Sequence, residues 1–375
     1  MDNSAKFIGW AAGIAVVAAV IVFMYVGTST PSETGPITIG FIAPLTGDVA
    51  SIGSVARTAT ELAVEEINSA GGIDGRQLNV VYEDGQCSAT PANNAATKLI
   101  NADRVIAIIG GVCSSETAAF APTAMQNKIV VISECSSAPN LSKTGKYFFR
   151  NYPSDAYQGK YAAEHAYNML GARNAALIFH QTDWGTGIKD VFKQRFTELG
   201  GNIVVEDGSP QEARDYRTAL SKVKVANPDY IYAPTYPEGG TVLLRQIKEM
   251  GINSKILAGD AWSDTRLQKD VASFDLDILY VESKGNVTDE FKSKLLAKTG
   301  GDQVPLCAPQ VYDATYILAE ALKKAGTDPD KLADAMRATK YDGVSGHIEF
   351  DANGDMTVAE YIVKRIENGT AAQVQ

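Results

Sequence analysis

The chain has few of the residues that build metal centres, and it has no excess of positive charge. Only four cysteines and three histidines occur among its 375 residues, too few for a multi-zinc or iron–sulfur protein. Acidic side chains outnumber basic ones 44 to 34, which gives a formal net charge of -10 and an isoelectric point near 5.0. A nucleic-acid binder needs a positive stripe for phosphates, so this composition argues against that class.

The motifs that usually mark catalysis are also missing. None of His165, His180 and His347 belongs to an HExxH pattern or to a paired metal spacing. The chain contains neither a GxSxG elbow nor a Walker loop. The S-x-x-K spacing at Ser221–Lys224 has no companion motifs, so it indicates a solvated helix face.

The segment DANGD, which begins at Asp351, starts like a calcium-binding loop. The sixth position of that loop is Met356 instead of glycine, and the twelfth is Ile362 instead of glutamate. A turn is therefore the better interpretation. We accordingly expect no enzyme, no metal site and no cofactor.

What is present is the composition of a folded protein with an apolar N-terminal run. Hydrophobic residues make up 45% and charged residues 21%, and at ~100–200 residues per domain the length predicts two domains. Phe7 to Val26 carries no charge; as a helix it would span about 30 Å, the thickness of a bilayer core. Neither a clear small-residue cleavage site nor a lipid-accepting cysteine follows it. We interpret residues 1–26 as an uncleaved membrane anchor in preference to a cleaved signal or a buried core helix, and residues 27–36 as a flexible linker.

Both leading interpretations of the N-terminus place the rest of the chain outside the cytoplasm, where disulfides form. Cys87 and Cys113 would close a loop of roughly 25 residues, and Cys135 and Cys307 are the other possible pair. Spacing alone does not establish this connectivity. Glycosylation sequons begin at Asn140, Asn286 and Asn368, and they are consistent with export without showing that any is used.

Short apolar runs alternate with helical stretches, and the pattern occurs twice. The first set has expected strands at 37–42, 78–82, 105–109 and 129–133, with helices at 55–68, 91–100 and 116–126. The second has strands at 176–179, 203–205, 230–233 and 256–258, with helices near 157–170, 187–199, 216–225 and 239–250. This alternation predicts two α/β lobes, each a doubly wound parallel sheet wrapped by helices. Two further helices are expected at 308–325 and 330–339, and a hairpin between 347–350 and 357–366.

Polar and aromatic residues gather where these strands end, which is where open parallel sheets bind ligands. Ser114 and Ser115 precede a helix, so hydroxyls and backbone amides could hold an anion there. In the second set, Asp260 is a candidate for a cation, and three aromatic residues supply apolar walls with polar tips. Such a site suits a small zwitterion held between two lobes. The aromatic residues are Trp184, Tyr236 and Trp262.

Each of these residues also has a purely structural interpretation. Ser114 could be a helix cap, and Asp260 could cap a helix near Asp264 or lie in solvent. Trp184 and Trp262 could be packing residues. The convergence of such residues on successive strand ends favours the binding site.

At these residues the sequence resembles the leucine/isoleucine/valine-binding protein family, the solute receptors of branched-chain amino-acid ABC importers. The resemblance covers about Ile37 to Gly369. It is carried by IGFIAPLTGDVASIGSVARTATELAVEEINSAGGIDGRQLNVVYEDGQC, GGVCSSET and GHIEFDANGD. It implies a type I periplasmic-binding-protein fold, in which three crossover strands join the two lobes. We place the crossovers near 150–153, 281–285 and 343–347, so that lobe 1 is 37–151 plus 285–343 and lobe 2 is 152–284 plus 344–375.

The resemblance also implies roles for individual residues. Ser114 and the Ser136/Ser137 region match the groups that hold the ligand's α-carboxylate. Tyr236 and Asp260 match the groups that meet the α-ammonium. Trp184 falls at an aromatic lid, and the family's lobe 1 disulfide would join Cys87 to Cys113.

Four positions near the site depart from the family pattern, so the side-chain preference stays open. Ile52 stands where relatives can have an aromatic residue, Cys135 where a small residue is usual, and Cys307 where an apolar wall residue is expected. Glu134 is also unusual there. We hypothesise a Cys135–Cys307 bridge, with free thiols as the alternative. The expected ligand-binding residues are Ile52, Ser114, Cys135, Ser136, Ser137, Trp184, Tyr236, Asp260 and Cys307.

The implied function is that of a monomeric extracytoplasmic receptor, tethered by residues 7–26, which closes on an amino acid and delivers it to a membrane permease. A branched-chain or other apolar amino acid is the expected ligand. The alternatives are a sensory ligand-binding domain, or a receptor for urea, short amides or aromatic acids. The last group lacks one zwitterion pole, so those ligands would leave Asp260 without an ammonium.

Overall fold

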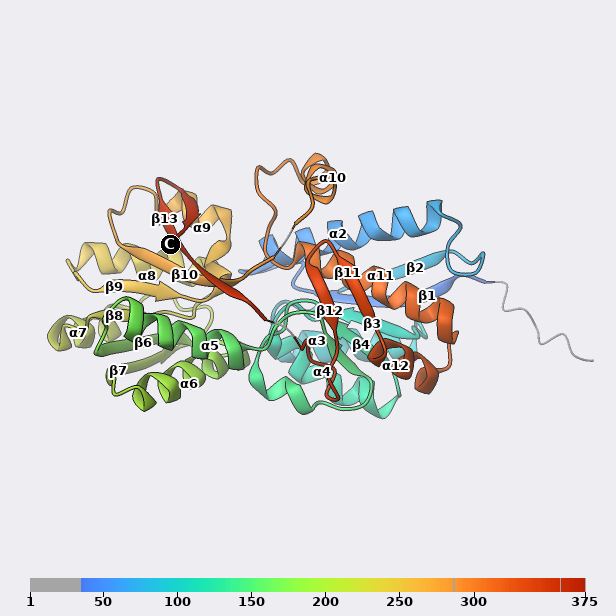
Figure 1. Ribbon diagram of the computed structural model, residues 1–375, viewed down its shortest axis with the longest axis horizontal. Helices are drawn as coiled ribbons and strands as arrows, with labels where there is room; N and C mark the ends of the chain where they lie inside the picture. Colours follow the sequence, from blue (N-terminus) through green and yellow to red (C-terminus); the bar gives the residue numbers. More distant parts are fainter. Residues whose placement is uncertain (1–34, 286, 358, 375) are drawn as a thin grey trace, which may run out of the picture. The chain divides into compact units, whose positions relative to one another are not determined.

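Figure 1 shows the computed structural model, which describes residues 35–285, 287–357 and 359–374. Strands and helices alternate along most of this chain, and they form the α/β fold that the sequence predicts. The apolar run 7–26 lies outside the described residues, so the anchor stays a prediction. No helix within the described ranges is long and apolar enough to cross a membrane.

The first sheet has five parallel strands in the order β2-β1-β3-β4-β5. Helices pack on both of its faces, and this is why the short central runs of β3 (Ala107–Gly110) and β4 (Val130–Ser133) are wholly buried. The four strands expected here are confirmed; β5 has only three residues, too short for a periodic signal. The remaining elements are β1 (Ile37–Ala43), β2 (Leu78–Asp84), β5 (Phe148–Arg150), α2 (Ala50–Ser69), α3 (Ala89–Asn101) and α4 (Ser114–Gln126).

The second sheet has seven strands in the order β14-β13-β10-β9-β8-β6-β7. Strands β6 to β10 run parallel, whereas β13 and β14 add an antiparallel edge that the sequence pattern does not predict. The strands are β6 (Asn174–His180), β7 (Asn202–Ser209), β8 (Tyr230–Tyr232), β9 (Lys255–Ala258), β10 (Ile278–Ser283), β13 (Tyr361–Glu367) and β14 (Thr370–Gln373). The helices of this part are α5 (Asp155–Glu164), α6 (Asp183–Glu198), α7 (Arg217–Ala226), α8 (Pro237–Glu249) and α9 (Thr265–Asp270).

The chain between β10 and β13 returns to the first sheet. There α11 (Ala308–Ala325) packs against α2, and the hydroxyl of Tyr316 donates to Glu66 of α2 at 2.8 Å. Two further helices are α10 (Asp289–Thr299) and α12 (Pro329–Arg337). We call the part built on the first sheet, with α2–α4, α11 and α12, the first lobe, and the part built on the second sheet, with α5–α9, the second lobe.

The predicted hairpin between 347–350 and 357–366 forms only beside its turn, where Phe350 and Met356 make an isolated antiparallel bridge and Thr357 N donates to Glu349 O at 3.1 Å. Strand β12 (Gly346–Glu349) pairs instead with β11 (Lys340–Gly343), and β13 pairs with β10 and β14. Asp313 of α11 fixes the β11–β12 turn by accepting from Val344 N at 2.9 Å and from Ser345 N at 2.7 Å. A carboxylate remote in sequence thus decides which strand β12 pairs with.

The DANGD segment is a turn, as predicted: Asp351 Oδ1 accepts from Asn353 N at 2.7 Å and from Asp355 N at 3.0 Å. The carbonyl of Gly354 accepts from Arg150 N of β5 at 2.9 Å. The predicted lobe boundaries stay a prediction. We propose that the third crossover lies after Gly354 and before β13.

Candidate functional site

A cavity of about 30 Å³ lies among the loops at the carboxyl ends of strands from both sheets. All the predicted ligand-binding residues line it except Ser136 and Cys307, and their role as ligand contacts stays a prediction. From the sequence, a wall residue is expected at position 307, whereas the structure places the preceding residue, Leu306, in the wall of the cavity. The lining residues are Val49, Ile52, Val112, Cys113, Ser114, Cys135, Ser137, Trp184, Tyr236, Asp260, Ala261 and Leu306.

Ser114 is the first residue of α4 and is almost fully buried. Its Oγ accepts a hydrogen bond from Ala138 N at 3.1 Å, which leaves the hydroxyl proton free for another acceptor. Ser114 is not the cap of α4, because Cys113 holds that position; its hydroxyl bonds to a neighbouring loop and lines the cavity at the helix N-terminus.

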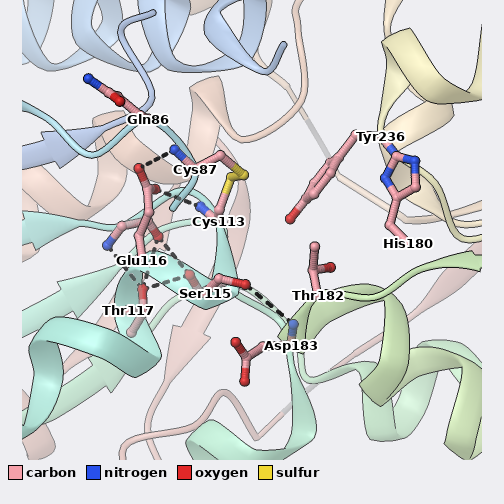
Figure 2. Close-up of a disulfide and its surroundings, with 12 residues drawn as sticks. Gln86, Cys87, Cys113, Ser115, Glu116, Thr117, His180, Thr182, Asp183 and Tyr236 are labelled. Carbon is pink, nitrogen blue, oxygen red and sulfur yellow. Dashed lines mark hydrogen bonds between the residues drawn. A yellow bond between two sulfur atoms is a disulfide. The ribbon is translucent and has the colours of Figure 1, made fainter. Parts of the chain in front are cut away.

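Ser115 has a different role from the one that its position predicts. Its Oγ accepts from Asp183 N of the second lobe at 3.3 Å, so it joins the lobes (Figure 2). Behind it, the buried carboxylate of Glu116 accepts from Cys87 N and Cys113 N, both at 3.0 Å. Burial raises the pKa of Glu116 to about 7, although these two donors oppose the rise.

The neighbouring serines of the β4 loop point to different places. Ser136 Oγ donates to the carbonyl of Gly111 at 2.7 Å and lies 2.7 Å from the hydroxyl of Thr117, so it is committed to the first lobe. Ser137 lines the cavity, and its hydroxyl donates to Asp155 Oδ2 at 2.7 Å. Of this pair, only Ser137 therefore lines the cavity in this structure.

Asp260 follows β9 at the start of a short 3-10 helix (Asp260–Ser263) and is 3% exposed. Its Oδ2 accepts from the hydroxyl of Tyr152 at 2.6 Å and from Gln158 Nε2 at 2.8 Å. Burial raises the pKa of Asp260, while these two hydrogen bonds oppose the rise. The capping alternative is excluded, because Asp264 itself caps α9.

Two aromatic rings of the second lobe form one wall of the cavity. Trp184 and Tyr236 stack with their ring centroids 4.9 Å apart. His180 holds Tyr236 in place by accepting from its backbone N at Nδ1, at 3.1 Å. Figure 2 shows the His180 ring next to Tyr236. Burial lowers the pKa of His180 to about 4, so its ring is neutral at physiological pH. Trp262, by contrast, is a packing residue that donates to Thr235 O at 3.0 Å.

Both disulfides are formed. The Cys87–Cys113 bridge that the resemblance implies has a Cα–Cα distance of 5.2 Å, and the hypothesised Cys135–Cys307 bridge has one of 5.5 Å. No metal-binding cluster of His, Cys, Asp or Glu occurs within the described part of the chain.

Polar contacts link the two lobes around the cavity. Asp48 of the loop after β1 pairs with Arg214 of the second lobe at 2.6 Å. Asn140 Nδ2 donates to Asp183 Oδ1 at 3.2 Å, and Ser51 Oγ donates to Asp264 Oδ2 at 3.2 Å. These contacts belong to a closed arrangement, because the cavity in this state has room for only one or two water molecules.

Arg214→Ala should weaken ligand binding by no more than about fivefold, because the Asp48–Arg214 pair is solvent-exposed and such pairs contribute about 0.2–1 kcal/mol. The loss should shrink as salt is raised. Calorimetric titration at low and high salt measures both effects. Arg217→Ala is the matched control, because Arg217 pairs with Glu249 inside the second lobe. An equal loss in both variants would contradict a role for Arg214 in closure.

Two α/β lobes that enclose a cavity with hydroxyl, carboxylate and aromatic walls define a two-lobed solute receptor. A family model described as periplasmic binding protein matches residues 36–371. The chain belongs to this family, which confirms the resemblance and the fold class and implies an extracytoplasmic location.

Relatives and solved structures agree with this assignment. The leucine-, isoleucine-, valine-, threonine- and alanine-binding protein of Pseudomonas aeruginosa is 29% identical over 362 residues, 92% of this chain and 93% of that protein. The crystal structure of the leucine-binding protein LivK from Thermotoga maritima has a TM-score of 0.84 at 29% identity, with 90% of this chain and 98% of that chain covered. LivJ of Streptococcus pneumoniae in complex with isoleucine has a TM-score of 0.81 at 27% identity, with 90% and 99% covered.

Proposed function

We propose that this protein is the extracytoplasmic substrate-binding component of an ABC importer and that it binds an apolar α-amino acid between its lobes. The observation that carries the proposal is the cavity that has the Ser114 hydroxyl at a helix N-terminus in one lobe and the Asp260 carboxylate in the other. These groups complement the α-carboxylate and the α-ammonium of a zwitterion.

The cavity walls argue for an apolar side chain on the ligand. Val49, Ile52, Val112 and Leu306 line it from the first lobe and from the segment that precedes α11. A charged side chain would lose its hydration against these walls without gaining a partner. Relatives named for binding leucine, isoleucine and valine support the same ligand class.

The mechanism is closure. An open form admits the amino acid, and the ligand stabilises the closed form because it contacts both lobes. Opening is necessary, because a cavity of about 30 Å³ is too small to admit an amino acid. The closed receptor, acting as a monomer and tethered by residues 7–26, then delivers the ligand to the permease without chemical change.

A thermal-shift panel tests the ligand class. Valine, leucine and isoleucine should raise the melting temperature, because a ligand at 100 times its dissociation constant adds about 2.7 kcal/mol to stability. Benzoate and acetamide should not, since neither offers an ammonium to Asp260. A shift with benzoate and none with any amino acid would reject the proposal.

Loss of high-affinity amino-acid uptake on deletion of the gene separates import from sensing.

A further inference from the structure

A second cavity, of about 210 Å³, adjoins the candidate ligand cavity. Leu306 lines both cavities, Cys135 lines only the ligand cavity, and Cys307 lines only the second one. The Cys135–Cys307 disulfide therefore extends from one cavity to the other beside Leu306. Bridge and side chain together form the partition between the two spaces.

This partition rests on a segment with little regular structure of its own. Residues 301–307 connect α10 to α11 without helix or strand, and the backbone bond within the segment's final turn runs from Ala308 N to Pro305 O at 3.3 Å. The disulfide attaches this segment to the β4 loop, which carries Ser137, across a sequence separation of 172 residues. A covalent bond at the next residue thus restrains the position of Leu306 relative to the ligand groups.

We propose that the Cys135–Cys307 bridge determines specificity by holding Leu306 as a wall that limits the length of the ligand's side chain. This rests on the proposed binding of an apolar amino acid. With the bridge intact, the side chain is confined to the ligand cavity. Without it, the segment before α11 can shift, the two cavities can join, and longer side chains gain space. One extra or missing methylene in such a pocket alters discrimination by about 10–200-fold.

The test is the ratio of the dissociation constants for phenylalanine and valine, measured by calorimetry. The oxidised wild-type protein should prefer valine, and Cys135→Ala/Cys307→Ala should lower the ratio about tenfold. Leu306→Ala, which keeps the bridge but removes the wall side chain, should lower it as well and serves if the double variant does not fold.

Reduction tests the bridge within each variant, which is compared only with itself before and after reduction because Cys113 of the other disulfide lines the ligand cavity. In Cys87→Ala/Cys113→Ala, a dithiol reductant acts only on the Cys135–Cys307 bridge, converting it to two thiols, and should lower the ratio. In Cys135→Ala/Cys307→Ala the same reductant should not change it. An unchanged ratio in Cys135→Ala/Cys307→Ala and in Leu306→Ala, or a wild-type preference for phenylalanine, would overturn the proposal. Failure of the wild-type protein to bind any amino acid would instead reject the proposed function.

Discussion

Asp260→Asn should weaken binding of an amino acid by about 30-fold or more while the protein stays folded. The ammonium of the ligand would lose a buried counter-charge, and losses of this kind are about 2–5 kcal/mol. The amide oxygen can still accept from Tyr152 and Gln158, which now donate to Asp260 at 2.6 and 2.8 Å, so the local structure has replacement partners.

A comparison of two ligands that differ in the amino group tests whether the lost affinity comes from the ammonium. Leucine and its deaminated analogue 4-methylpentanoate share the carboxylate and the side chain, so only leucine should lose most of its affinity in Asp260→Asn. Asp215→Asn, which changes an exposed carboxylate of the same lobe, should bind like the wild type. Wild-type affinity for leucine in Asp260→Asn, measured by calorimetry, would remove Asp260 from the site.

Glu134→Gln should stabilise the protein at pH 8 by roughly 4 kcal/mol and leave its stability at pH 4 unchanged. Glu134 is fully buried, and neither carboxylate oxygen has a hydrogen-bond partner among the described residues. Burial, with a smaller contribution from the neighbouring Glu116, raises the pKa of Glu134 to about 8, while the residue's own backbone N–H opposes the rise.

The sign follows from proton binding. Between pH 4.5 and about 8 the folded state holds a proton on Glu134 that the unfolded chain has released, so stability falls as the pH rises through this range. Glutamine stays neutral at every pH, so Glu134→Gln removes this dependence of stability on pH.

Urea unfolding of the wild type and of Glu134→Gln from pH 4 to pH 9 measures the difference between their free energies of unfolding, because the contributions of other groups cancel. Glu116→Gln is the contrasting control: Glu116 accepts from two backbone donors, and a single amide oxygen cannot replace both carboxylate oxygens, so this variant should lose stability. Parallel pH profiles for the wild type and Glu134→Gln would show that Glu134 is ionised in the folded protein.

The candidate site was predictable to the level of loops but not always of side chains. Ser114, Trp184, Tyr236 and Asp260 follow strands whose apolar runs are legible in the sequence, and the carboxyl ends of parallel strands meet at one edge. Ser136 and Ser137 are adjacent in the same loop, and their hydrogen-bond partners decide that only Ser137 lines the cavity. These partners are Gly111 and Thr117 for Ser136, and Asp155 for Ser137.

Other features of the candidate site have no periodic pattern in the sequence that would predict them. The wall residue is Leu306 and not Cys307, because the segment before α11 is irregular and its register has no pattern to read. Asp155, which accepts from Ser137, lies in the first turn of α5, where an acidic residue is ordinary. Burial next to the cavity is what distinguishes it.

The sequence by itself determined the two-lobed α/β class and the loops that carry the site. Local hydrophobic periodicity encodes both, because each strand and helix buries its own apolar residues. Tertiary structure alone decided the partner of β12, the direction of Ser136, the Leu306 wall and the protonation of Glu134. Each of these depends on groups remote in sequence, whose distance and burial exist only after the chain has folded.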